Sequence, residues 1–272
     1  MSETLSKAAE LDAVLDAIGA VAVAVSGGVD SMTLAVAAGR RLGARAEMIH
    51  ATSPAVPPEA TGRVQDYARR EGWRLEVIDA GEFADPDYLA NPANRCFFCK
   101  TNLYGTIAAR TRATIASGTN LDDLGDWRPG LQAAAAHGVR HPYVEAGIDK
   151  STVRALARQL GLFDLAELPA APCLSSRLAT GIRVTAERLH LVHAVERLIA
   201  REIAPQTVRC RLFHDGVAIQ LDPDALQRIQ DAPAAALRRT IEDLAGGKGG
   251  SAVRYEPYRM GSAFLRTAAD GA

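Results

Sequence analysis

The first half of the chain alternates between short, continuous apolar runs and longer stretches whose apolar residues recur at helical spacing. The apolar runs predict strands that are covered on both faces, at residues 21–25, 46–51, 75–78 and 113–117. The helical spacing predicts helices at residues 2–17, 29–42, 58–71 and 99–111. Strands that alternate with helices in this way predict an α/β fold, with a parallel sheet flanked by helices.

The pattern changes after Leu168. Residues 169–181 are rich in Pro, Ser, Ala and Gly, which predicts a loop or linker. Further along, helices are expected at residues 185–203, 223–229 and 234–244, and strands at 208–212, 217–221 and 252–255. The Asp215-Gly216 dipeptide between two of these strands is typical of a hairpin. We therefore predict two domains, an α/β domain at residues 1–181 and a small α+β domain at residues 182–272.

A glycine-containing loop, Ser26-Gly-Gly-Val-Asp-Ser31, joins the first predicted strand inside the sheet to a helix. Gly27 and Gly28 allow a tight turn and leave room for a phosphate, while backbone amides converge at the positive end of the following helix. Ser26 and Ser31 offer hydroxyl donors, and Asp30 can hold Mg²⁺ or shape the loop. The lysine-containing GxxxxGK[ST] loop is absent. The sequence thus predicts a phosphate site, against the alternative of an ordinary strand–helix turn.

Bulk properties restrict the class of protein. With 272 residues, 48% of them hydrophobic, the chain can form a sizeable core, and a net charge of −1 gives no general attraction to nucleic acid or membranes. The apolar stretch at residues 18–25 is too short to span a bilayer. We expect a cytoplasmic protein without a membrane segment. Four cysteines in such a chain indicate metal or redox chemistry rather than a disulfide scaffold.

The phosphate loop resembles the signature of the PP-loop ATP pyrophosphatases. That resemblance implies ATP as cofactor with Mg²⁺, cleavage between the α- and β-phosphates, and an adenylated acceptor. The segment 117–123, SGTNLDD, is similar to the second nucleotide-side loop of that family. It would bind the nucleotide through Gly118, Thr119, Asn120 and Asp123. The alternative for this segment, taken alone, is a polar turn after a strand.

Three further segments, NRCFFCK (94–100), GTNLDDLGDWRPG (118–130) and APCLSSR (171–177), resemble the LarE family of sulfur transferases over residues 10–255. The resemblance implies adenylation of a carboxylate on a pyridinium mononucleotide and its conversion to a thiocarboxylate, for a nickel-pincer nucleotide cofactor. Single-cysteine members of that family give up the sulfur of the residue that matches Cys173. The resemblance to this family also implies a homo-oligomer that assembles through the second domain.

This chain matches a three-cysteine version, because Cys96 and Cys99 form a C-x-x-C in addition to Cys173. Three thiolates could hold a [4Fe-4S] cluster whose open iron carries sulfide from an external donor. The alternatives for the C-x-x-C are a zinc site, a redox dithiol or two thiols in a loop. Cys173 would then be either a cluster ligand or a sacrificial sulfur donor. Arg177 is a candidate for stabilising its thiolate.

The acceptor would carry phosphate and carboxylate groups. Arg209 and Arg211, two residues apart on a predicted strand, would share one face and could clamp the phosphate, as the matching arginines of the family suggest. Their alternative is a solvated strand face. Asp126 and Arg128 in the second loop, and Ser176 beside Cys173, complete the predicted substrate-binding set.

Other classes of function use the same loop. A tRNA thiolase shares it and can carry an iron–sulfur cluster, but the net charge of −1 and the lack of interleaved basic and aromatic residues weigh against nucleic acid. An amide-forming synthetase would need a source of ammonia that this sequence lacks. A regulator without catalysis would not need Asp30 and both loop serines intact.

Overall fold

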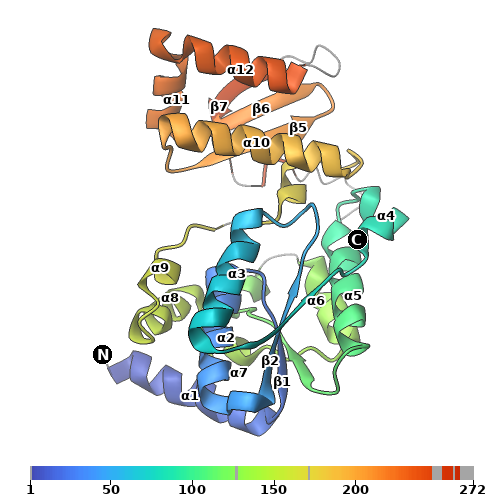
Figure 1. Cartoon of the computed structure of the whole chain (residues 1–272), viewed down its shortest axis with the longest axis vertical. Helices are drawn as coiled ribbons and strands as arrows, with labels where there is room; N and C mark the ends of the chain where they lie inside the picture. Colours follow the sequence, from blue (N-terminus) through green and yellow to red (C-terminus); the bar gives the residue numbers. More distant parts are fainter. Residues whose placement is uncertain (1, 126–127, 171, 247–252, 260, 264–272) are drawn as a thin grey trace. The chain divides into compact units, whose positions relative to one another are not determined.

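The computed structural model describes residues 2–125, 128–170, 172–246, 253–259 and 261–263. The chain forms two compact units (Figure 1). The first comprises Met1–Asp85 and Asn94–Ala171, and the second comprises Pro86–Ala93 and Pro172–Ala272. Residues 172–181, which we grouped with the first predicted domain, thus belong to the second compact unit. The functional domain limits remain a prediction.

The first unit contains a four-stranded parallel sheet with the order β3-β2-β1-β4. Its strands are β1 (Val21–Ala24), β2 (Ala46–Ala51), β3 (Arg74–Ile78) and β4 (Thr114–Ala116). All four lie at the predicted positions to within two residues at either end, and the predicted α/β fold is confirmed. In such a sheet every strand ends at the same edge, so the loops after β1 and β4, which are neighbours, meet there.

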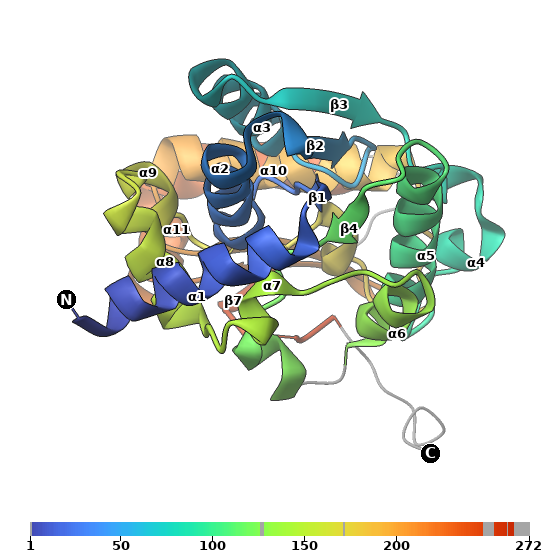
Figure 2. The same ribbon diagram turned by 90° about the horizontal axis from the view of Figure 1, so that it is seen from below.

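Helices cover both faces of this sheet (Figure 2). They are α1 (Ser2–Ile18), α2 (Val29–Leu42), α3 (Pro58–Glu71), α5 (Arg95–Ala108), α6 (Pro129–Ala136), α7 (Pro142–Glu145), α8 (Lys150–Gln159) and α9 (Phe163–Ala166). Side chains alternate along β1: Val21 and Val23 pack into the core shared with α1, α2 and α8. Ala22 points to the opposite core, with Tyr104 of α5. The alternation explains why β1 reads as continuously apolar, since both faces are buried.

Helix α5 begins at Arg95, four residues before the start that we predicted at Cys99. The predicted start was wrong because the first turn, Arg95-Cys-Phe-Phe, has no helical apolar period. In this turn the rings of Phe97 and Phe98 pack edge to face, with centroids 5.5 Å apart. Both cysteines of the C-x-x-C therefore lie in the first two turns of a helix.

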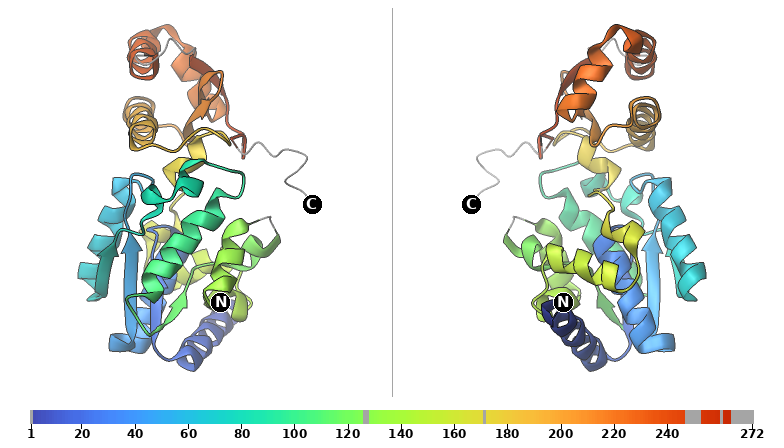
Figure 3. Two further views of the ribbon diagram at one scale, coloured as in Figure 1. Left: turned by 90° about the vertical axis from the view of Figure 1, so that its right-hand side faces the viewer. Right: turned by 90° about the vertical axis from the view of Figure 1, so that its left-hand side faces the viewer.

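The second unit has a three-stranded sheet with the order β5-β6-β7. Its strands are β5 (Val208–Phe213), β6 (Gly216–Leu221) and β7 (Val253–Pro257). β5 and β6 form the antiparallel hairpin predicted from Asp215-Gly216, whereas β6 and β7 are parallel. Helices α10 (Ala186–Ile203) and α12 (Ala235–Gly246) pack side by side (Figure 3), and the unit also includes α11 (Pro223–Gln230) and α4 (Pro86–Leu89). The small α+β architecture is therefore confirmed.

The segment predicted as a linker is packed rather than open. Leu174–Arg177 forms a 3-10 turn, η4, and all four of its side chains are buried. Composition misled the prediction, because the hydroxyl of Ser175 is satisfied by a partner far away in sequence, the hydroxyl of Tyr88, at 2.7 Å. Across the described residues, no helix combines the length and apolarity needed to cross a membrane.

Candidate functional site

The loop between β1 and α2 has the geometry of an anion cradle. Gly27 has φ +83°, a conformation that disfavours other residues, and a Cβ there would lie 2.8 Å from the carbonyl oxygen of Ala60. Helix α2 begins at Val29, so its first backbone amides have no acceptor within the helix and face the end of the loop. This arrangement favours a bound anion at the helix N-terminus.

Hydrogen bonds within the loop fix its shape. The Ser31 hydroxyl accepts from the Ser26 amide at 3.0 Å and donates to the Gly28 carbonyl at 3.2 Å. Arg63 of α3 donates to the Gly27 carbonyl at 2.7 Å. Ser31 therefore braces the loop, while Ser26 is exposed. The sequence reasoning missed Arg63, which comes from a helix that carries no motif.

Asp30 is the charged centre of this cradle. Its carboxylate accepts from Lys150 Nζ at 2.5 Å and from Asn120 Nδ2 at 3.2 Å. Lys150 is the first residue of α8 and was also missed by the sequence reasoning. The loop lacks the lysine of the GxxxxGK[ST] type, and Lys150 brings an ammonium group to it from a distant part of the chain. Asp30 and Asn120, both predicted nucleotide ligands, are thus in contact.

The second predicted nucleotide loop lies directly against the first. A Cβ on Gly118 would lie 2.7 Å from the Ser31 amide nitrogen and 2.9 Å from the Asp30 carbonyl carbon. Asp123 accepts from the Asn120 amide at 3.1 Å and pairs with Arg128 at 2.8 Å. The two segments predicted to bind nucleotide therefore form one continuous surface in the first unit. Asp126 lies outside the described residues.

In the second unit, the turn that carries Cys173 is held by a buried arginine. Arg177 donates through two nitrogens to both oxygens of Glu196, at 3.0 Å each, and to the carbonyls of Pro172 and Cys173 at 2.7 and 3.2 Å. Ser176 adds a bond from its hydroxyl to the Cys173 carbonyl at 2.8 Å. These contacts of Arg177 and Ser176 fix the backbone of Cys173, and Cys173 itself is exposed.

The two arginines of β5 share one face, as predicted, but differ in their surroundings. Arg211 is buried and donates to Gln220 Oε1 at 2.6 Å, to the Ser176 carbonyl at 3.1 Å and to the Arg259 carbonyl at 3.3 Å. Arg209 is half-buried and lies over the ring of Tyr258, 5.8 Å from its centroid. Burial lowers the pKa of both groups and the charge of Arg177 lowers each pKa further, while Glu196 and Tyr258 raise both in part. A cluster of cations that repel one another attracts an anion.

The remaining cysteines have contrasting environments. Cys96 and Cys99 are not in a disulfide and lie half-buried near the N-terminus of α5, while Cys210 is fully buried on β5. Burial raises the pKa of the Cys210 thiol far above its usual range, which agrees with its predicted packing role. Within the described part of the chain, no three His, Cys, Asp or Glu side chains come together as a metal site.

Two relatives match the chain over most of its length. It is 30% identical over 230 residues to the pyridinium-3,5-bisthiocarboxylic acid mononucleotide synthase of Lactiplantibacillus plantarum, an alignment that spans 83% of this chain and 82% of the synthase. The chain belongs to the LarE family. It is also 38% identical over 227 residues to the uncharacterized protein slr1717 of Synechocystis sp., covering 82% and 84% of the two chains. None of the protein-family models searched matches it.

The predicted site residues of this LarE-family chain fall into three groups. The first unit brings together the predicted phosphate loop and the predicted second loop. The second unit brings together Cys173, Ser176, Arg177, Arg209 and Arg211. Cys96 and Cys99 lie on α5 of the first unit, next to α6, where a Cβ on Gly130 would lie 3.7 Å from the Cys96 carbonyl oxygen.

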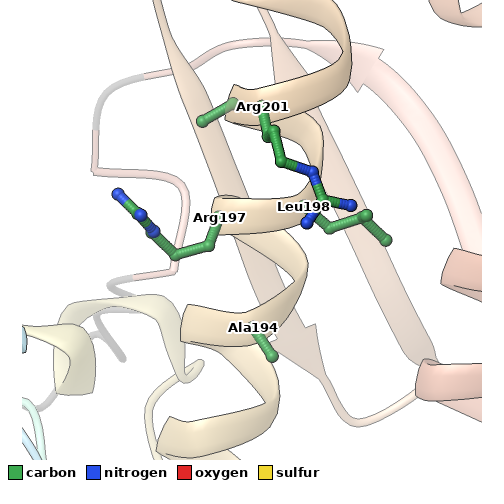
Figure 4. A pocket seen from close by; sticks show the side chains of 5 residues that line it. Ala194, Arg197, Leu198 and Arg201 are labelled. Carbon is green, nitrogen blue, oxygen red and sulfur yellow. The ribbon is translucent and has the colours of Figure 1, made fainter.

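A shallow hollow on α10 lies apart from these groups (Figure 4). The residues that line it all belong to that helix and include Arg197, Leu198 and Arg201. None of the predicted site residues lines it. Two acidic residues of the second unit have structural roles: Glu196 binds Arg177, and Asp222 caps α11 by accepting from the Ala225 amide at 3.0 Å.

Proposed function

We propose that this LarE-family chain is an ATP-dependent sulfur transferase that converts a carboxylate of a pyridinium mononucleotide into a thiocarboxylate. The observation that carries the proposal is the phosphate cradle, whose loop at residues 26–31 has no lysine of its own and in which Gly27, Asp30 and Gly118 are each held in tight contacts with their surroundings. The relative from Lactiplantibacillus plantarum, which is named as a bisthiocarboxylic acid mononucleotide synthase, supports the choice of acceptor.

The first step is adenylation. A carboxylate oxygen of the acceptor attacks the α-phosphorus of ATP, and pyrophosphate leaves with the electron pair of the broken P–O bond. The amides at the start of α2 and the ammonium group of Lys150 would stabilise the negative charge of the pyrophosphate. Asp30 would hold Mg²⁺ together with phosphate oxygens, a donor set that suits this ion. Lys150 would then leave Asp30 for a phosphate.

The second step transfers sulfur. A sulfur nucleophile attacks the acyl carbon of the adenylate, the C–O bond to AMP breaks, and AMP leaves as a far better leaving group than hydroxide. The exposed position of Cys173 on a pinned turn suits a sulfur atom that has to meet a substrate. Sulfide as nucleophile gives the thiocarboxylate directly. If the Cys173 thiolate attacks, loss of its α-proton and cleavage of its Cβ–S bond release the thiocarboxylate and leave dehydroalanine.

Three cysteines suit a [4Fe-4S] cluster as donors, because thiolates are the usual ligands of such clusters. Cys96 and Cys99 are separated by one helical turn on α5, and neither is in a disulfide. Cys173, also free, would supply the third thiolate. When bound, a cluster held by three thiolates would carry an external sulfide on its fourth iron and spare Cys173 from consumption. We favour this version over the sacrificial one because the C-x-x-C is present.

The phosphate of the acceptor would bind in the second unit. Arg209 is the better ligand because it is only half-buried, whereas Arg211 is buried and donates to Gln220, Ser176 and Arg259. We infer that Arg211 orients the face and that Arg209 contacts the phosphate. Arg209→Ala should weaken acceptor binding by about 1.5–3 kcal/mol, the contribution of a charge-assisted hydrogen bond, and leave ATP binding unchanged. Equal acceptor affinity in this variant and the wild type would contradict the assignment.

The product of ATP cleavage tests the function as a whole. Phosphorus NMR of a reaction with a pyridinium carboxylate mononucleotide should show AMP and pyrophosphate, and Asp30→Ala should abolish both. ADP as the sole nucleotide product would exclude adenylation. Stimulation by tRNA but not by the mononucleotide would favour a tRNA thiolase instead. Size-exclusion chromatography with light scattering will test the predicted homo-oligomer.

The fate of sulfur separates the two versions of the chemistry. In the cluster version, replacement of Cys96, Cys99 or Cys173 by Ser should each lower bound iron, and wild-type protein supplied with sulfide should turn over repeatedly. In the sacrificial version, mass spectrometry after one turnover should show the chain lighter by one H₂S at residue 173, and Cys96→Ser should remain active for that turnover. Dehydroalanine formed stoichiometrically in iron-free, active protein would refute the cluster version.

A further inference from the structure

A short segment extends the parallel sheet of the first unit beyond β4. Arg140 forms a parallel bridge with Ala116, through bonds from its amide to the Ile115 carbonyl at 2.9 Å and from the Ser117 amide to its own carbonyl at 3.1 Å. His141 follows at once. It therefore lies at the same edge of the sheet as the phosphate loop and the second loop, where α/β proteins bind their ligands.

His141 is joined to the second loop by a chain of polar atoms. Its Nδ1 lies 2.9 Å from the Ser117 hydroxyl, and this hydroxyl lies 3.0 Å from the hydroxyl of Thr119. Ser117 is 7% exposed and His141 is half-buried, so little water competes for these bonds. No motif includes His141, and the proposed reaction so far gives it no role.

The end of this chain lies beside the phosphate cradle. Ser117 and Thr119 flank Gly118, where an added Cβ would lie 2.7 Å from the Ser31 amide nitrogen at the start of α2. The next residue, Asn120, bonds the carboxylate of Asp30. The Tyr143 hydroxyl, two residues beyond His141, donates to the Asp30 carbonyl at 3.1 Å. His141, Thr119 and the cradle are therefore parts of one packed cluster.

We propose that His141 is a positioning residue of the nucleotide site, which acts through Ser117 to turn the Thr119 hydroxyl hydrogen toward a phosphate oxygen of ATP. The inference rests on the proposed ATP-dependent function. The directions of the hydrogen bonds determine which atom of each group has to donate. A phosphate only accepts, so Thr119 has to donate to it, and Ser117 then has to donate to Thr119. Ser117 in turn accepts from His141, which fixes the proton on Nδ1.

The charges around His141 allow this arrangement over a range of pH. Burial lowers the pKa of His141, and the carboxylates of Glu145 and Asp123 raise it in part. Arg140 pairs with Glu145, and Arg128 pairs with Asp123. The ring is thus neutral at neutral pH. Because Nδ1 donates in this tautomer and also in the imidazolium form, acidification should not weaken ATP binding through His141.

The test is a double-mutant cycle on the KM for ATP, measured as AMP formation by the full chain. His141→Ala and Thr119→Val should each raise this KM about ten- to a hundred-fold, the effect of one lost charge-assisted hydrogen bond, with a smaller change in kcat. The double variant should be no worse than either single variant, since both remove the same bond. His141→Asn, whose amide can donate from nearly the same position, should recover most of the affinity. His137→Ala is the matched control from the same unit.

Each outcome has a distinct meaning. Additive losses in the double variant, or a wild-type KM in His141→Ala, would overturn the inference while AMP formation by the wild type still supported the proposed function. Absence of AMP formation by the wild type would overturn the function itself. The pH profile is a separate readout: the ratio of KM in the wild type to KM in His141→Asn should stay level or fall toward pH 5.5. A ratio that rises on acidification would show that Nδ1 accepts, and the proposed direction would be wrong.

Discussion

Replacement of Gly118 by alanine tests whether the two nucleotide loops work as one surface. The added Cβ would lie 2.7 Å from the Ser31 amide nitrogen, whereas ordinary contacts begin at 3.4 Å, so the loops would have to separate by about 0.7 Å (3.4 − 2.7). The atoms in the way belong to the backbone of α2 and cannot rotate aside. Gly118 has no positive φ, so the effect would be steric.

Overpacking of this kind costs about 1–3 kcal/mol. If the loops separate and the whole cost appears in the free energy of ATP binding, ATP affinity should drop by about five- to 150-fold, since each 1.4 kcal/mol is tenfold. The assay is titration with ATP or a fluorescent analogue, together with kcat/KM for AMP formation. Gly125→Ala is the matched control, because it lies in the same loop with open space around its Cβ position. Unchanged ATP affinity in Gly118→Ala would refute the close approach of the loops as a requirement for binding.

Three further changes test other parts of the site. Lys150→Met should lower kcat for AMP formation about 10²- to 10³-fold, as expected for a lost electrostatic contact to transferring phosphates. The free energy of unfolding should change by less than about 1 kcal/mol, because the pair with Asp30 is partly exposed. Normal turnover in this variant would exclude a catalytic role for Lys150. Arg177→Met should destabilise the folded chain by about 3–5 kcal/mol in urea unfolding, because it leaves the carboxylate of Glu196 buried without its partner; a change below 1 kcal/mol would contradict this. In iron-free protein at pH 8, iodoacetamide should label the exposed Cys173 and spare Cys210, because Cys210 is buried and burial raises the pKa of its thiol. Peptide mass spectrometry measures the labelling, and modified Cys210 would contradict the prediction.

The elements of the fold could be predicted because each depends on local patterns. Apolar runs marked the four strands of the first sheet, and Asp215-Gly216 marked the hairpin of the second. Residues 139–141 are too short to read as a strand, so the extension of the sheet at Arg140 was not predicted. The buried turn at 174–177 was read as a linker, because composition does not reveal that Tyr88 and Arg211 would satisfy its polar groups.

The site was predicted as far as its motifs extend. Asp30, Asn120 and Gly118 do lie together, because the strands that precede them are neighbours in a parallel sheet. Lys150 is 120 residues from Asp30, and nothing around it distinguishes it from any other lysine at the start of a helix. The sequence was similarly incomplete for Arg211. The alternation of side chains along a strand correctly placed it on one face with Arg209, but it could not reveal that the nitrogens of Arg211 already donate to other groups of the protein.

The way in which Cys173 is anchored has a consequence for the lifetime of the protein. Among the described residues, its hydrogen bonds to the fold run through the main-chain oxygen, which accepts from Ser176 and Arg177, and not through the side chain. A molecule whose sulfur had been removed would keep these bonds and hence its thermal stability. Cellular quality control, which detects unfolded chains, would then have no means of telling exhausted molecules from fresh ones. Exhausted copies would accumulate in the folded pool and compete for ATP, a burden that a renewable sulfur carrier avoids.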